Sequence, residues 1–177
     1  MEAETINWTL ILAGASLALG LFPLGRLLFR ININAPMFAT AIQKLIAADN
    51  LDRAIKLSRA APAAPLANGT RALLEAYQEG IRDSLALKEA FETGAGGLKR
   101  TIGKFTWMSY TGLALFLLAA GFAFALGFNL RPEEGGLGLA AFVVSFLGIT
   151  KALGFRRQAE MARDQMINFL LEWEAKK

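Results

Sequence analysis

The chain has 177 residues, no cysteine and no histidine, and a formal net charge of +4. Hydrophobic residues make up 54% of it and the mean hydropathy is +0.38, which is too apolar for an ordinary soluble domain of this length. The composition excludes disulfides, thiol chemistry, histidine-ligated haem and the usual zinc sites. The basic pI indicates membrane topology and contact with anionic lipid, and no interleaved basic and aromatic surface points to nucleic acid.

Three long stretches without charge predict three transmembrane helices. They cover residues 6–25, 105–130 and 135–150, and the third extends to 155 if Lys151 reaches the interface with its ammonium group. About twenty apolar residues cross a hydrocarbon core of roughly 30 Å. The first stretch could instead be a cleaved signal peptide, although its acidic start is unusual for one. The third could be half of a re-entrant hairpin.

The cations predict the orientation of these spans. Twelve of the 19 Lys and Arg residues lie between 26 and 104, and six lie between 151 and 177. The positive-inside rule therefore predicts an external N-terminus and a cytoplasmic C-terminus. The expected fold is an all-α integral membrane protein. Its parts are a first transmembrane helix (1–30), a cytoplasmic helical domain (31–104), a transmembrane helix pair (105–155) with a short external turn at 129–136, and a cytoplasmic C-terminal helix (156–177).

The cytoplasmic insert begins with two predicted helices. Asn34 is suited to an N-cap and Pro36 to the first turn of a helix. Apolar residues at helical spacing then predict a helix over 37–48. In the Ala-Asp-Asn turn that follows, Asp49 or Asn50 caps a second helix over 51–60.

Prolines and glycines divide the rest of the insert. Pro62 and Pro65 end the second helix, because proline lacks the N–H that a helix interior needs. A third helix starts near Leu66 and can continue past Gly80. The glycine-rich segment 93–97 interrupts the chain before the second span. Its glycines do not form a phosphate loop. Their spacing differs from the Walker pattern, no Ser or Thr follows the lysine, and no strand precedes the segment.

The segment after the third span predicts one amphipathic helix. Its apolar face either packs on the chain's own cytoplasmic helices or meets neighbouring subunits. The residues of this face are Ala159, Ala162, Met166, Phe169 or Leu170, and Trp173.

The insert carries a resemblance to a known family. The segment "FATAIQKLIAADNLDRAIKLSRAAPAAPLANGTRALLEAY" resembles the cytoplasmic segment of the MotA/TolQ/ExbB proton-channel family, in its three-span ExbB/TolQ branch. The matching positions are Asn50, Arg53, Ala54, Leu57, Pro62, Pro65, Leu66 and Ala67. The resemblance covers about forty residues closely, and the order of spans and insert along the whole chain more loosely.

The spans resemble the family less closely. In "AFVVSFLGI" Ser145 stands where the family tends to have a channel-facing threonine, and Gly148 matches its glycine. Thr150 follows nearby. The second span lacks the family's small-residue motif, and only Thr111 can be aligned with its threonine. The resemblance therefore implies four channel-lining candidates, Thr111, Ser145, Gly148 and Thr150.

The resemblance also implies a function. An ExbB/TolQ-like subunit of the bacterial inner membrane forms a ring, often five-fold, around a single-span ExbD/TolR-like partner that supplies a carboxylate. Such a complex converts proton-motive force into movement of an envelope assembly, and needs membrane lipid but no cofactor and no metal. The alternative is a non-conducting structural or assembly protein that docks a partner through its cytoplasmic hairpin. An enzyme is not expected, because the sequence offers no nucleophile–base set, metal cluster or catalytic carboxylate pair.

Overall fold

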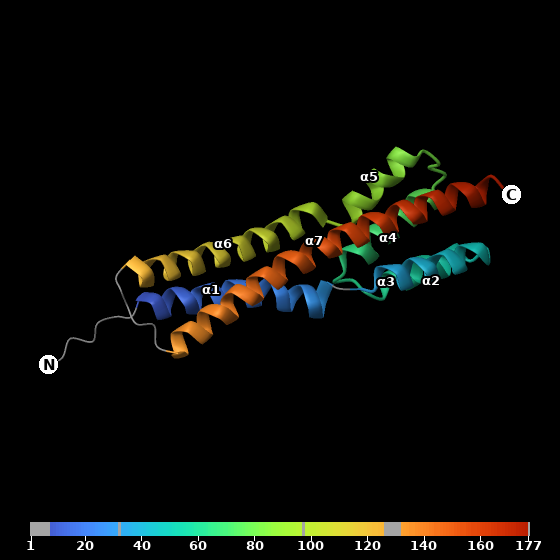
Figure 1. The fold of residues 1–177 in the computed structure, drawn as a ribbon. Helices are drawn as coiled ribbons and strands as arrows, with labels where there is room; N and C mark the ends of the chain where they lie inside the picture. The colour runs from blue at the N-terminus through green and yellow to red at the C-terminus, as the bar shows by residue number, and fades with distance from the viewer. Residues whose placement is uncertain (1–7, 32, 97, 126–131, 177) are drawn as a thin grey trace. The chain divides into compact units, whose positions relative to one another are not determined.

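The computed structural model describes residues 8–31, 33–96, 98–125 and 132–176, and the secondary structure of these residues is entirely helical (Figure 1). They form two compact units. The span unit belongs to Met1–Leu28 and Gly103–Leu153, and the insert unit belongs to Phe29–Ile102 and Gly154–Lys177.

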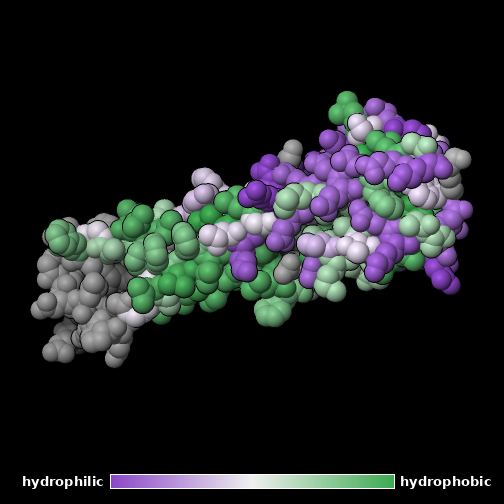
Figure 2. Space-filling model, turned by 45° about the vertical axis from the view of Figure 1, so that its right-hand side comes forward, coloured by the Kyte–Doolittle hydropathy of each residue, from purple (hydrophilic) through white to green (hydrophobic). Residues whose placement is uncertain are grey.

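The span unit is built from α1 (Trp8–Arg26), most of α6 (Leu98–Ala125) and the first half of α7 (Pro132–Glu174). Each of the three is long and apolar enough to cross a membrane, which confirms the three apolar helices that the sequence predicts. On the face that Figure 2 shows, hydrophobic side chains predominate on the span unit, whereas hydrophilic ones gather on the insert unit. The helices are thus those of a multi-pass membrane protein in length and composition.

The last helix, α7, runs through 43 residues without a break. At a rise of 1.5 Å per residue it is about 65 Å long. The predicted border between the third span and the tail, at residues 155 and 156, falls inside it. Residues 132–136, which the sequence assigned to an external turn, already belong to α7, and 129–131 lie outside the described residues. Proline as the first helical residue, followed by Glu133 and Glu134, is a favourable helix start.

A short π-helix, η1 (Leu27–Ile31), follows α1 directly. It comes shortly after Pro23, which lies inside α1 and cannot donate a backbone hydrogen bond. The first span therefore ends in a wider helical turn rather than in a cap.

The insert unit begins as the sequence predicts. Helix α2 (Ala35–Ala47) starts at the N-cap Asn34, whose side chain accepts a hydrogen bond from the Met37 N–H. Asn50 occupies the N-cap position of α3 (Leu51–Arg59), although its side chain makes no capping hydrogen bond. The predicted N-cap of α2 is confirmed.

The later helices of the insert correct one prediction. Helix α4 (Pro65–Gln78) ends before Gly80, whose φ of +97° suits glycine and stops the helix. It does not continue past Gly80; instead Asp83 caps a separate helix, α5 (Ser84–Gly94), by accepting from the Ala86 N–H. The interruption predicted at 93–97 is shorter in the structure, since residues 93 and 94 still belong to α5 and the break falls at Ala95 and Gly96, the latter at φ +61°, while residue 97 lies outside the described residues.

The core of the insert unit is built from buried residues of α2, α3, α4, α5 and the second half of α7. The ring of Phe91 fills the space that a Cβ on Gly69 would need, so α4 and α5 approach closely. The predicted apolar face of the tail is turned inward, with four of its residues buried: Ala159, Ala162, Met166 and Leu170. Of the two alternatives for this face, packing on the chain's own helices is present in the structure.

Candidate functional site

The three spans meet at small residues. Each contributes one serine and one glycine, three or four positions apart: Ser16 and Gly20 from α1, Ser109 and Gly112 from α6, and Ser145 and Gly148 from α7. We call these six residues the serine–glycine node. All three serine side chains are completely buried. A glycine or serine every three or four residues lets membrane helices approach closely, so the node is the point of tightest contact between the spans.

One conventional hydrogen bond links two spans within the node. The Ser16 hydroxyl donates to the carbonyl oxygen of Gly112 at 2.6 Å. The carbonyl can accept this bond in addition to its bond within α6, because it has two lone pairs. An interhelical hydrogen bond of this kind contributes about 0.6 kcal/mol on average in a membrane protein.

The other two hydroxyls lie against glycines. A Cβ on Gly20 would be 2.8 Å from Ser145 Oγ, and a Cβ on Gly112 would be 3.0 Å from the same atom. The Ser109 hydroxyl faces Gly148 in the same way, 2.7 Å from the position of a Cβ. The hydroxyl oxygens therefore occupy the room that three missing side chains leave.

Neither of these two hydroxyls has a hydrogen-bond partner among the described residues. Glycine Cα–H groups beside them can act as weak donors to the oxygens. The hydroxyl protons remain unused, and a buried hydroxyl without a partner costs about 1–3 kcal/mol. Ser109 and Ser145 are thus polar groups in an apolar interior whose hydroxyls have no partner among the described residues.

The four predicted channel-lining residues differ in their surroundings. Ser145 and Gly148 belong to the node. Thr111 is half-buried and Thr150 is exposed, and their hydroxyls donate to carbonyls of their own helices, Trp107 O at 3.0 Å and Phe146 O at 3.1 Å. Bonds of this local kind leave both hydroxyls able to accept from a group outside the chain.

The residues that carry the family resemblance in the insert divide into an inner and an outer set. Ala54, Pro65, Leu66 and Ala67 are buried, whereas Arg53 and Pro62 are exposed, Leu57 is 37% exposed, and Asn50 is half-buried. The turn between α3 and α4 is held by Asn68, whose amide donates to the Pro62 carbonyl at 2.8 Å. Half of the matching positions therefore lie in the packed interior around the α3–α4 hairpin, and the other half lie at its surface.

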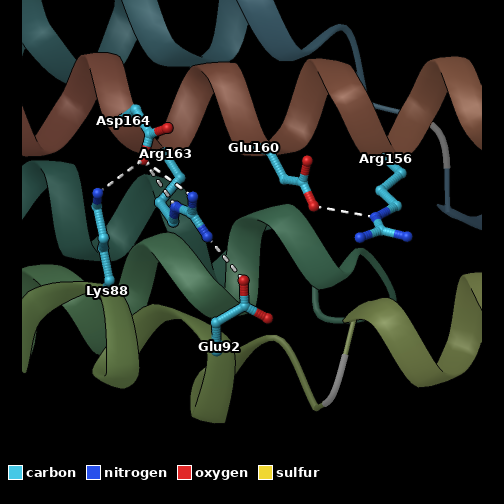
Figure 3. Close-up of polar contacts among 6 residues, drawn as sticks. All are labelled: Lys88, Glu92, Arg156, Glu160, Arg163 and Asp164. Carbon is cyan, nitrogen blue, oxygen red and sulfur yellow. Dashed lines mark hydrogen bonds and ion pairs between the residues drawn. The ribbon is translucent and has the colours of Figure 1, made fainter. Parts of the chain in front are cut away.

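A ladder of charges joins α5 to the second half of α7 (Figure 3). Arg163 pairs with Glu92 at 2.8 Å and with its neighbour Asp164 at 3.0 Å, and Lys88 approaches Asp164 at 3.8 Å. The Arg163 side chain is only 14% exposed, so its ion pairs are less screened than those on the open surface. Arg156 and Glu160 form a separate pair one turn apart on α7.

A second polar contact lies at the end of α7. The Tyr77 hydroxyl donates to the Glu174 carboxylate, which also pairs with Arg82 at 3.3 Å, and the Arg82 guanidinium stacks over the Tyr77 ring. Burial, and next the hydrogen bond to Glu174, raise the pKa of Tyr77 to about 12. We call these three residues the tyrosine clasp.

Sequence analysis singled out two of the six residues of the node, Ser145 and Gly148, through the family resemblance. The sequence also has Ser16 and Gly20 four positions apart, a small-residue spacing that favours close contacts between membrane helices. Ser109 and Gly112 were missed as a pair, because the family motif expected in that span is absent and one serine among several polar residues carries no signal of its own.

Among the described residues no group of carboxylates could hold a metal ion. Comparison of the chain with protein-family models, with curated proteins and with solved structures found no match.

Proposed function

We propose that this chain is a subunit of an ExbB/TolQ-like, proton-motive-force-driven complex in the bacterial inner membrane, with its N-terminus outside and the insert unit in the cytoplasm. The observation that carries the proposal is the position of Ser145 and Gly148. These two residues carry the resemblance in the third span, and they lie where all three spans meet. The two residues that resemble the family in the third span are thus also residues at which the three spans pack together.

The proposal gives the four candidate residues two different roles. A central channel in a ring is lined by surfaces that a single subunit exposes. Thr150 is exposed and Thr111 half-exposed, so these two residues would line the channel. Ser145 and Gly148 are enclosed within the subunit and would fix the angle and depth at which the spans hold those threonines.

The proposal includes a partner that supplies a carboxylate. The sequence has no Asp or Glu between residues 5 and 48 or between 93 and 132, so neither the first nor the second span contains a titrating acid. Proton transfer through lipid requires such a group or a chain of hydroxyls and waters. A single-span ExbD/TolR-like partner inside the ring would provide it.

A non-conducting structural or assembly role is the second candidate. Its support is the close packing of the node, where the two unpartnered hydroxyls lie directly against glycines. In this case the serines only hold the spans together, and the exposed surface of the insert unit docks another protein.

Native mass spectrometry of the gently extracted complex distinguishes the two candidates by their oligomeric state. A closed ring that retains a single-span protein supports the motor subunit. A monomer or dimer overturns the ring and favours the second candidate.

Proton flux then tests the role of the threonines. The complex is reconstituted in liposomes that contain a pH-sensitive dye, and a pH gradient is imposed. Thr150→Ala should lower the flux. Thr40→Ala is the matched control, because Thr40 is also exposed and its hydroxyl also bonds the carbonyl four residues earlier, but in α2 of the insert unit. A ring without flux, or equal flux in both variants, counts against the conducting role.

A further inference from the structure

We propose that Arg26, Lys104 and Lys151 form a girdle that binds the phosphates of anionic phospholipids at one end of the span unit. This inference goes beyond the proposed function and does not depend on proton conduction. The three residues lie on three different helices, α1, α6 and α7, and all three side chains are exposed. None of them forms an ion pair that the structure records among the described residues.

The contacts of the node place the three cations at one depth. Ser145 lies against Gly20 and Gly112, so these three residues define a common level across the spans. Gly148 faces Ser109, which precedes Gly112, so α6 runs opposite to α7. Helices α1 and α7 run in the same direction (Figure 1), so residues after Gly20 and Ser145 lie on the same side of this level as residues before Gly112.

The three cations lie at similar distances from this level along their helices. Arg26 lies six residues after Gly20, Lys151 six residues after Ser145, and Lys104 eight residues before Gly112. At 1.5 Å per residue these separations are about 9 to 12 Å on the same side of the node. The depth of Lys104 differs from that of the other two cations by about one half-turn of helix, which the flexible lysine side chain can span.

The sequence of the span unit has no acidic residue near these cations, because its glutamates, at positions 2, 4, 133 and 134, stand at least seventeen residues before Arg26 or Lys151. The sequence segments 5–28, 103–132 and 135–153 contain neither Asp nor Glu. Three positive charges at one level, beside an apolar helical surface, require anions from outside the unit. In a membrane the anions at that depth are lipid phosphates, and basic residues at the membrane surface attract anionic lipids.

An aromatic side chain favours lipid over an acidic protein segment as the occupant. Trp107 lies three residues after Lys104, on the same face of α6, and its side chain is 73% exposed. Exposed tryptophan at this position is typical of the headgroup level of a membrane, where the indole contacts both acyl chains and water. By the positive-inside rule the leaflet is the cytoplasmic one.

The test measures lipid retention by the full-length protein. The protein is purified in mild detergent and incubated with phosphatidylglycerol or phosphatidylcholine, and bound lipid is counted by native mass spectrometry. The wild type should retain phosphatidylglycerol preferentially. The triple variant Arg26→Gln, Lys104→Gln, Lys151→Gln should lose that preference, by about fivefold in apparent affinity for each cation removed.

Two matched variants separate local charge from total charge and from folding. Lys44→Gln, Arg53→Gln, Lys56→Gln removes three exposed cations from the insert unit and should keep the preference. Arg26→Lys, Lys104→Arg, Lys151→Arg keeps the charges and should keep it as well. Should the triple glutamine variant fail to fold, Lys104→Gln alone is expected to lose about fivefold.

Four results would overturn the girdle. The wild type could show no preference for phosphatidylglycerol, or the insert-unit variant could lose as much lipid as the girdle variant. Inorganic phosphate could displace the lipid at equal concentration, which would assign a free anion site. Finally, a copurifying acidic protein, released by the girdle variant, could occupy the place of the lipid.

Discussion

A Cβ atom on Gly20 would lie 2.8 Å from the hydroxyl oxygen of Ser145, so α1 and α7 touch at a separation that only glycine permits. The same Cβ would come within 3.1 Å of Val144 Cγ1 and 3.2 Å of the Ser145 amide nitrogen. The Ser145 nitrogen belongs to the backbone and cannot move aside easily, and the β-branched Val144 has a stiff χ1 torsion. The contact is therefore a sensitive point of the span unit.

Gly20→Ala should destabilise the span unit. Inserting a methyl group into a close-packed interior costs about 1–3 kcal/mol in the free energy of unfolding. Gly14→Ala is the control, because it lies on the same helix and a Cβ there meets nothing within 4 Å. Unfolding in mixed micelles, followed by circular dichroism, measures both. Equal stability of the two variants would show that the node is looser than described.

Ser16→Ala should remove the one conventional interhelical hydrogen bond of the node. The expected loss is about 0.5–1.5 kcal/mol, because the hydroxyl is buried and bonds the Gly112 carbonyl. Thr111→Ala should cost less, since the Thr111 hydroxyl bonds only a carbonyl of its own helix. The same micelle titration compares them. A larger effect at Thr111 would contradict the assignment.

Arg163 and Glu92 should be energetically coupled. A double-mutant cycle with Arg163→Gln and Glu92→Gln is expected to give about 1 kcal/mol of interaction energy, because Arg163 is largely enclosed. Arg59 and Glu75 form the reference pair, with side chains 60% and 40% exposed and a similar separation of 3.0 Å. Their coupling should be a few tenths of a kcal/mol at most. Coupling energies that do not differ between the pairs would refute a special role for the α5–α7 ladder.

Tyr77 should make stability depend on alkaline pH. Its pKa is raised from 10.0 to about 12 in the folded chain, so the unfolded chain loses this proton first as the pH rises. The contribution of the neutral phenol is complete below pH 10 and falls between about pH 10 and 12. The difference in unfolding free energy between the wild type and Tyr77→Phe should therefore shrink over that range. Parallel curves up to pH 12 would contradict the clasp.

The helices and their ends follow largely from local chemistry. Asn34 followed by Pro36 predicts the start of α2, and Pro65 the start of α4, because capping oxygens and proline act within one turn. The end of α4 was harder to predict. Gly80 is tolerated within a helix as well as at its end, and the structure places it in a Schellman motif, in which the Gly80 N–H donates to the Tyr77 carbonyl and the Ile81 N–H to the Ala76 carbonyl.

The node could not be derived from the sequence in the same way. Spacing alone marks Ser16 with Gly20 as a contact surface, but it does not say which residue of another span lies opposite. That pairing depends on the relative depth of the three helices. The sequence does not set this depth, because every turn of an apolar helix is equally suited to face another span. Ser109 is recognised as a residue of the node only from its contact with Gly148 in the structure.

The π-helical turn at Leu27–Ile31 has a consequence for insertions and deletions. A π-helical turn holds one residue more than an α-helical turn, so the chain carries a surplus residue there. Deleting Leu28, whose side chain is 40% exposed, should convert η1 into an ordinary α-helical turn and keep α1 in register. Deleting Leu17 instead would rotate Gly20 relative to Ser16 and misalign the node. The first span thus has a site at which its length can change by one residue without disturbing what its serine and glycine contact.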